Sequence, residues 1–125
     1  MAAIERGPSE GAPRKTAVAP GAFFDIDMRA GRVVAVEPFP EARKPAYKLA
    51  VDFGAPVGVL WTSAQVTNYG RAELEGRMVV GAVNLGAKRI AGFTSEFLVL
   101  GAIGDDDTVR LLRLEDEVEP GAPIA

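Results

Sequence analysis

The strongest constraint on the fold is a series of short β-rich segments that glycine and proline separate. Residues 31–37 (GRVVAVE), 57–63 (VGVLWTS), 77–83 (RMVVGAV) and 95–103 (SEFLVLGAI) are each apolar and β-branched over only a few residues. In residues 47–53, Tyr, Leu, Val and Phe alternate with Lys, Ala and Asp. This alternation predicts a strand with one face in the core and one face in water.

Only one segment has a helical pattern. Residues 71–75 (RAELE) suit a short helix, and Gly76 is suited to end it. The element order predicts an all-β protein, an OB-fold five-stranded Greek-key barrel with a short helix between strands 3 and 4 and terminal extensions. An SH3-like barrel or a small sandwich would also have many short strands, but neither explains the helix as well. A further strand is predicted at residues 109–114.

The chain of 125 residues is long enough for one domain with a single core. Residues 1–22 are rich in Pro, Gly, Ala and Ser, which predicts a disordered N-terminal tail, and residues 23–125 are expected to form the folded domain. No apolar run has the length of a membrane span, and no signal peptide is recognisable. A cytoplasmic location is therefore expected.

Two residue types are absent from the chain. Without cysteine and histidine, there is no disulfide, thiolate chemistry, structural zinc site or histidine-based triad. No motif for carboxylate or Ser–Lys catalysis is recognisable either. The sequence therefore predicts a protein that is not an enzyme, with no catalytic residues, no cofactor and no metal.

Charge is distributed unevenly along the chain. Residues 28–93 carry nine basic and five acidic side chains, whereas residues 94–125 carry two basic and eight acidic ones. In an OB-fold the ligand lies across strands 2 and 3, between the loop joining strands 1 and 2 and the loop joining strands 4 and 5. These loops contain Arg43–Lys44 and Lys88–Arg89, so barrel closure is expected to bring four cations to one end as a site for an anionic ligand.

Trp61 and Tyr69 are the candidates for base stacking beside that site. The simpler interpretations stay open: the loop cations are only solvated, and Trp61 belongs to the core. Residues 97–100 (FLVL) are apolar on both faces of the predicted strand, so something besides the barrel must cover one face. Either residues 23–26 (FFDI) of the same subunit or a second copy of the chain provides that cover.

Several stretches resemble a known family. Residues 27–34 (DMRAGRVV), 39–49 (FPEARKPAYKL), 52–54 (DFG), 62–67 (TSAQVT) and 89–96 (RIAGFTSE) are similar to the CsaA-type export chaperones, a branch of the tRNA-binding-domain family. The resemblance covers residues 24–125 in order. It implies an OB-fold homodimer without catalysis, which binds tRNA or other structured RNA. It also implies a chaperone that holds unfolded preproteins for the Sec export machinery, without membrane insertion.

The resemblance also implies site residues by position. Asn84 and Lys88 match the basic loop that members use toward tRNA, and Ser95 matches the serine that opens the next strand. With the loop cations, the predicted RNA-binding set is Arg43, Lys44, Asn84, Lys88, Arg89 and Ser95. The predicted peptide-binding set is Trp61, Ser63 and Gln65. The predicted dimer interface is Phe23, Phe24, Ile26, Phe97, Leu98 and Leu100.

The chain departs from the family pattern at two places. RNA-binding members follow the serine with an acidic residue and Gly-Met, whereas this chain has Phe97 and Leu98 after Glu96, which argues against strong tRNA affinity. Residues 85–89 (LGAKR) replace the Phe-Pro-Pro-Arg loop of the chaperone branch, which predicts a more mobile loop with one more cation. The alternative function is a structural or assembly subunit that docks another protein through its apolar strand without binding RNA.

Overall fold

The alternating strand near residue 50 supplies the centre of the core. In the computed structural model, which describes residues 11–125, β2 (Tyr47–Asp52) buries Leu49 and Val51 completely, and Phe53 follows just after its end. β1 (Met28–Pro38) and β3 (Val59–Ala64) pair antiparallel with β2 on its two sides. A β-bulge between Val33 and Ala35 shifts the register of β1, and Val34 is 53% exposed there.

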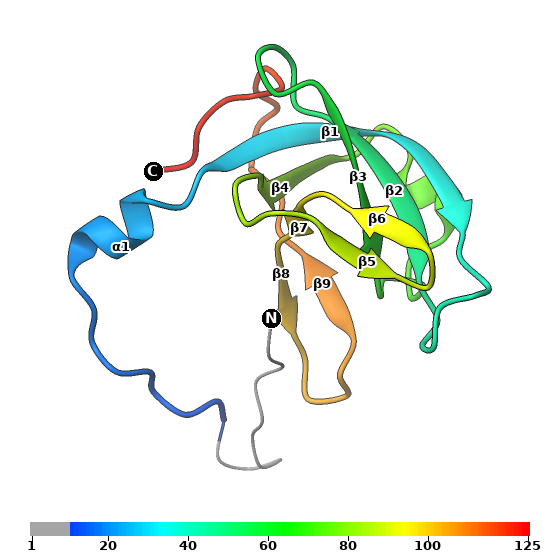
Figure 1. Cartoon of the computed structure of the whole chain (residues 1–125), viewed down its shortest axis with the longest axis horizontal. Coiled ribbons are helices and arrows are strands. Elements are labelled where there is room, and N and C mark those ends of the chain that lie inside the picture. The colour runs from blue at the N-terminus through cyan, green and yellow to red at the C-terminus, as the bar shows by residue number, and fades with distance from the viewer. Residues whose placement is uncertain (1–10) are drawn as a thin grey trace.

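The sheet curls into a nearly closed barrel (Figure 1). Its strand order is β3-β2-β1-β4-β7, in which β4 spans Met78–Ala82 and β7 spans Leu98–Val99. The free edge of β3 meets the chain just before β7: the Glu96 N–H donates to the Trp61 carbonyl at 2.7 Å, and Thr62 Oγ1 donates to the Phe97 carbonyl at 2.8 Å. The short helix α2 (Arg71–Leu74) lies between β3 and β4 in the chain. The predicted five-stranded barrel with its helix is confirmed.

Two glycines make room for the aromatic centre of the barrel. A Cβ atom on Gly31 would lie 2.5 Å from Val51 Cγ1, and one on Gly81 would lie 2.8 Å from Phe53 Cζ. Phe53 packs edge-to-face on Phe97, with 5.0 Å between the ring centroids. The strands β1 and β4 therefore approach the rings more closely than any side chain would allow.

The predicted loop at residues 84–94 contains a hairpin instead. β5 (Lys88–Ile90) and β6 (Phe93–Ser95) pair antiparallel across a two-residue turn, in which Ala91 and Gly92 have φ of 47° and 80°. Two successive positive φ values are typical of a type I′ turn. The sequence did not predict this hairpin because it lacks the Asn-Gly or Asp-Gly pair that usually marks such a turn.

The predicted strand at residues 95–103 is divided into separate pieces. After β7 the chain leaves the barrel, and β8 (Gly101–Ile103) pairs with β9 (Val109–Leu111) in a hairpin of its own that projects from the barrel (Figure 1). β9 is shorter than the strand predicted at residues 109–114. Gly101 permits the close pairing, because a Cβ atom there would lie 2.6 Å from Val109 Cγ1.

Helix α1 (Pro20–Phe24) and the C-terminus lie near the same end of the barrel (Figure 1). This short helix, which the sequence did not predict, overlaps the end of the predicted tail. Residues 1–10 of that tail lie outside the described residues, and its disorder stays a prediction. Near the C-terminus, the Gly121 N–H donates to the Ala30 carbonyl at 2.8 Å and the Ile124 N–H donates to the Met28 carbonyl at 2.9 Å. Neither helix in residues 11–125 has the length and apolar character to cross a membrane.

Candidate functional site

An aromatic contact joins the two loops that carry the basic pairs. Phe39 begins the loop between β1 and β2, and its ring lies 5.4 Å from that of Phe93 in β6. The Lys48 ammonium sits over both rings, 4.9 Å from the Phe39 centroid and 5.0 Å from the Phe93 centroid. Cation–π contacts of this kind hold aromatic rings together. The loop at residues 39–46 and the β5–β6 hairpin are therefore neighbours.

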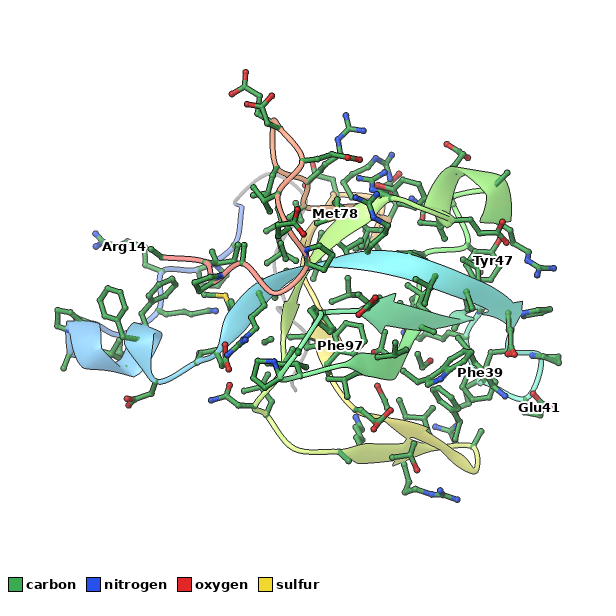
Figure 2. The ribbon with its side chains drawn as sticks, turned by 90° about the horizontal axis from the view of Figure 1, so that it is seen from above. Arg14, Phe39, Glu41, Tyr47, Met78 and Phe97 are labelled. Carbon is green, nitrogen blue, oxygen red and sulfur yellow. The ribbon has the colours of Figure 1, made fainter. Side chains whose placement is uncertain are left out.

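The two loops lie at the end of the barrel opposite α1. Figure 2 shows Phe39 and Glu41 at this end, far from the N-terminal helix. The two basic residues in the first loop, Arg43 and Lys44, are exposed to solvent. Lys88 and Arg89 in the hairpin are exposed as well.

The hairpin separates its two cations. Successive side chains of a strand point to opposite faces. Arg89 lies opposite Thr94, and its Nη1 donates to Thr94 Oγ1 at 2.8 Å. Lys88 lies opposite Ser95, on the hairpin face that also carries Phe93. The basic pair that forms one unit in the sequence therefore presents one cation on each face of the hairpin.

A hollow of about 290 Å³ lies between the hairpin and the outer face of the sheet. Its walls combine two aromatic rings with charged and hydroxyl side chains: it is lined by Glu37, Lys48, Trp61, Phe93, Thr94 and Glu96. Trp61 and Phe93 are half-buried and pack edge-to-face, with 6.4 Å between the ring centroids. The hollow therefore offers apolar ring surface and polar groups side by side.

The predicted peptide-binding residues lie in part at this hollow. Trp61 lines it, and Ser63 is the cross-strand neighbour of Lys48 on the same outer face. Gln65 is exposed beyond the end of β3 and is not among the lining residues. The other predicted stacking residue, Tyr69, lies elsewhere, since its hydroxyl accepts the Leu111 N–H at 3.0 Å.

Two of the predicted RNA-binding residues make hydrogen bonds inside the protein. Ser95 is 9% exposed, and its Oγ lies 3.0 Å from Thr62 Oγ1 at the seam of the barrel. The Asn84 side chain accepts the Asp27 N–H and donates to the Asp25 carbonyl, both at 2.8 Å. Asn84 therefore fastens the N-terminal arm, residues 20–27, to the end of β4. An RNA contact by either side chain would have to replace or share these bonds.

The predicted dimer-interface residues fall into two groups. In the N-terminal arm, Phe24 is 71% exposed, and Phe23 and Ile26 are also exposed; α1 buries none of its residues. Phe97, by contrast, is 4% exposed with its ring in the barrel core, and Leu98 and Leu100 are half-buried. The arm therefore carries the apolar surface, while Phe97 serves the core.

Sequence reasoning missed several residues of the hollow. Alternation puts Lys48 on the wet face of its strand, which is where it lies, but nothing local indicates two rings beside it. No pattern in the sequence indicates that Phe93, Thr94 and Glu37 line a site. Glu96 has no predicted role, yet its Oε1 accepts the backbone N–H of Trp61 at 3.0 Å and so helps to join β3 to the chain before β7.

A comparison with known families matches residues 28–123 to the family described as "Putative tRNA binding domain". The chain belongs to the tRNA-binding-domain family. The CsaA chaperone protein of Picrophilus torridus has a similar structure, with a TM-score of 0.83 and 45% identity over 87% of this chain and 100% of that one. The CsaA chaperone of Bacillus anthracis gives a TM-score of 0.83 and 40% identity over 88% of this chain and 100% of its own.

The family module also occurs within larger proteins. The methionine–tRNA ligase of Thermotoga maritima is 30% identical over 103 residues, which are 82% of this chain and 16% of the ligase. The chain thus spans about a sixth of that relative's length. The resemblance to the tRNA-binding-domain family and its CsaA branch is confirmed.

Proposed function

We propose that this protein is a non-enzymatic RNA-binding protein that binds tRNA or another structured RNA at the loop end of the barrel. The observation that carries this proposal is the Phe39–Phe93 contact, which makes neighbours of the two basic loops. Family membership supports an RNA ligand. Arg43, Lys44, Lys88 and Arg89 are the cations that would contact phosphates.

If these cations contact phosphates, the affinity for RNA must fall as the salt concentration rises. Each phosphate that a Lys or Arg neutralises releases counterions, so the slope of log K against log salt steepens by roughly 0.7 to 0.9 per contact. Three or four contacts at these loops therefore give a slope of about −2 to −4. An acidic protein without a clustered basic surface would not have such a slope.

Charge reversal in the hairpin tests the site. Lys88→Glu with Arg89→Glu is expected to weaken tRNA binding by at least about tenfold at low salt and to flatten the slope by about 1.5 to 2. Labelled tRNA is titrated by fluorescence anisotropy at several salt concentrations. Arg110→Glu with Arg113→Glu is the matched control, because both arginines are also exposed but lie in the acidic part of the chain. Unchanged tRNA binding by the hairpin variant would exclude this site.

The similarity to two CsaA chaperones favours a second activity. We propose that the protein also holds unfolded preproteins, with Trp61, Ser63 and Gln65 near the bound segment and the Sec machinery as a further partner. The half-buried Trp61 and Phe93 rings offer apolar surface for such a segment. Capture by apolar contact weakens little when salt is raised, unlike phosphate binding. If equimolar protein fails to slow the aggregation of any unfolded substrate, the chaperone activity is refuted.

The protein is proposed to be a cytoplasmic homodimer, with the exposed N-terminal arm at the interface. The alternative, an assembly subunit that docks another protein through its apolar strand without binding RNA, is favoured if tRNA shows no salt-dependent binding while the protein still forms a complex with a different protein.

A further inference from the structure

The hollow beside Trp61 has aromatic walls that are open to a planar ligand. Trp61 contributes from β3 and Phe93 from the hairpin, and both rings are half-buried rather than enclosed. The ring pair holds its geometry because Phe93 is also fixed by Phe39 and by the Lys48 ammonium. Half-buried aromatic faces in an OB-fold groove accept stacked bases.

The polar groups of the hollow are mainly hydrogen-bond acceptors. Glu37 and Glu96 line it with only one cation, Lys48, between them. The Glu96 carboxylate is oriented, since one oxygen accepts the backbone N–H of Trp61 at 3.0 Å. No residue in the part of the chain that the structure describes is hydrogen-bonded to its other oxygen. A ligand inside the hollow must therefore donate hydrogen bonds to be held well.

The loops around the hollow carry a net positive charge, because Glu41 is their one acid beside Arg43, Lys44, Lys88 and Arg89. The exposed Arg43 and Lys44 lie in one neighbouring loop and Lys88 in the other. A cationic peptide side chain would suit the carboxylates but would have to pass these basic loops. An apolar side chain would strip water from the carboxylates without replacing it. A nucleotide meets both demands, because its phosphates are anionic while its base can donate hydrogen bonds.

The acceptors also discriminate between bases. Guanine presents two adjacent N–H donors on its pairing edge, which match the two oxygens of a carboxylate, and a carbonyl oxygen that an ammonium can bind. Uracil has a single N–H donor between two carbonyl oxygens, which a carboxylate repels. We propose that the hollow binds one unpaired guanine, stacked on Trp61, with Glu37 or Glu96 on its N–H donors and Lys48 on its carbonyl oxygen. This inference rests on the proposed RNA function.

Three RNA hairpins test the assignment. They share one stem and a loop of uridines, and a single loop position carries guanosine, inosine or uridine. Inosine lacks only the amino group of guanosine. The full-length protein is expected to bind the guanosine hairpin about tenfold more tightly than the other two, the discrimination typical of one good bidentate base contact. Trp61 is the only tryptophan in the chain, so quenching of its emission reports stacking directly.

Glutamine substitutions test whether the two carboxylates cause the guanosine preference. Glu37→Gln with Glu96→Gln is expected to reduce the guanosine preference to less than about twofold, because an amide has one acceptor oxygen instead of a two-oxygen fork. Glutamine at 96 keeps an oxygen for the Trp61 N–H, and thermal melting verifies that the variant folds. Glu41→Gln is the control, since it removes an exposed charge in the neighbouring loop outside the hollow and should keep the preference.

The outcomes separate this inference from the function on which it rests. Equal binding of the three hairpins by a protein that still binds tRNA through its basic loops would overturn the guanine site alone. A preference that survives in the double variant would overturn it too. Absence of any RNA binding would overturn both proposals. If an extended arginine-containing peptide changes Trp61 emission and the guanosine hairpin does not, the hollow is a peptide site and the inference is wrong.

Discussion

At the scale of single residues, the sequence indicated which side chains face inward but not which ones meet. Alternation in β2 correctly separates Leu49 and Val51, which are buried, from Lys48 on the outer face, but Ala50 on that predicted wet face is buried as well. The two rings over which Lys48 lies come from a loop and a hairpin far apart in the chain. Since no local pattern records a contact between distant segments, the centre of the candidate site could not be predicted.

The glycines at the barrel core give a prediction at this scale. Gly81→Ala is expected to destabilise the protein by about 1 to 3 kcal/mol, because the added methyl group must displace the Phe53 and Phe97 rings in a packed core. Urea denaturation followed by circular dichroism measures the loss. Gly21→Ala is the control, because a Cβ atom there meets nothing within 4 Å. Equal midpoints for the two variants would contradict the account of the core.

At the scale of elements, the sequence predicted the strands of the barrel and the helix α2 but not the hairpin of the site. Each barrel strand has an apolar face that the sequence pattern indicates. β5 and β6 show no such pattern, since they are only three residues each, Lys88–Ile90 and Phe93–Ser95. Their pairing depends on a turn whose first residue, Ala91, is an unusual choice for positive φ. Because the hairpin was not predicted, the sequence also did not indicate that Lys88 and Arg89 lie on opposite faces of a strand.

The turn itself supplies a prediction at the scale of the hairpin. Ala91→Asn is expected to stabilise the protein by about 0.5 to 1 kcal/mol, since asparagine tolerates the left-handed conformation better than alanine and Asn-Gly is the preferred type I′ pair. Urea denaturation gives the free energy of unfolding. Ala87→Asn is the matched control, because Ala87 is also exposed near the hairpin but does not have positive φ. A loss of stability in the Ala91 variant would mean that the turn is not formed as described.

At the scale of the whole molecule, two surfaces of different chemistry lie at opposite ends. The basic loops and the hollow occupy one end, and the N-terminal arm and the C-terminal residues occupy the other (Figure 2). Association through the arm would leave both loop ends of a dimer open to RNA. The fold class was predictable because it follows from strand order, whereas this separation follows from where barrel closure puts each loop.

The N-terminal arm carries the apolar surface of the proposed dimer interface. Phe24 is 71% exposed in a helix that buries none of its residues, and burying one phenylalanine contributes about 1.5 to 3 kcal/mol. Each two-fold interface contains the residue twice, so Phe24→Asp is expected to weaken the dimer by at least about 100-fold, because two aromatic contacts are lost and two carboxylates must be desolvated. Sedimentation velocity at micromolar concentration should then show a dimer for the unchanged protein and a monomer for the variant. Val34→Asp, at a residue 53% exposed on β1, should remain dimeric. Since the arm lies away from the loops, the monomeric variant should keep the salt-dependent tRNA binding of each subunit, and a monomeric unchanged protein would refute the interface.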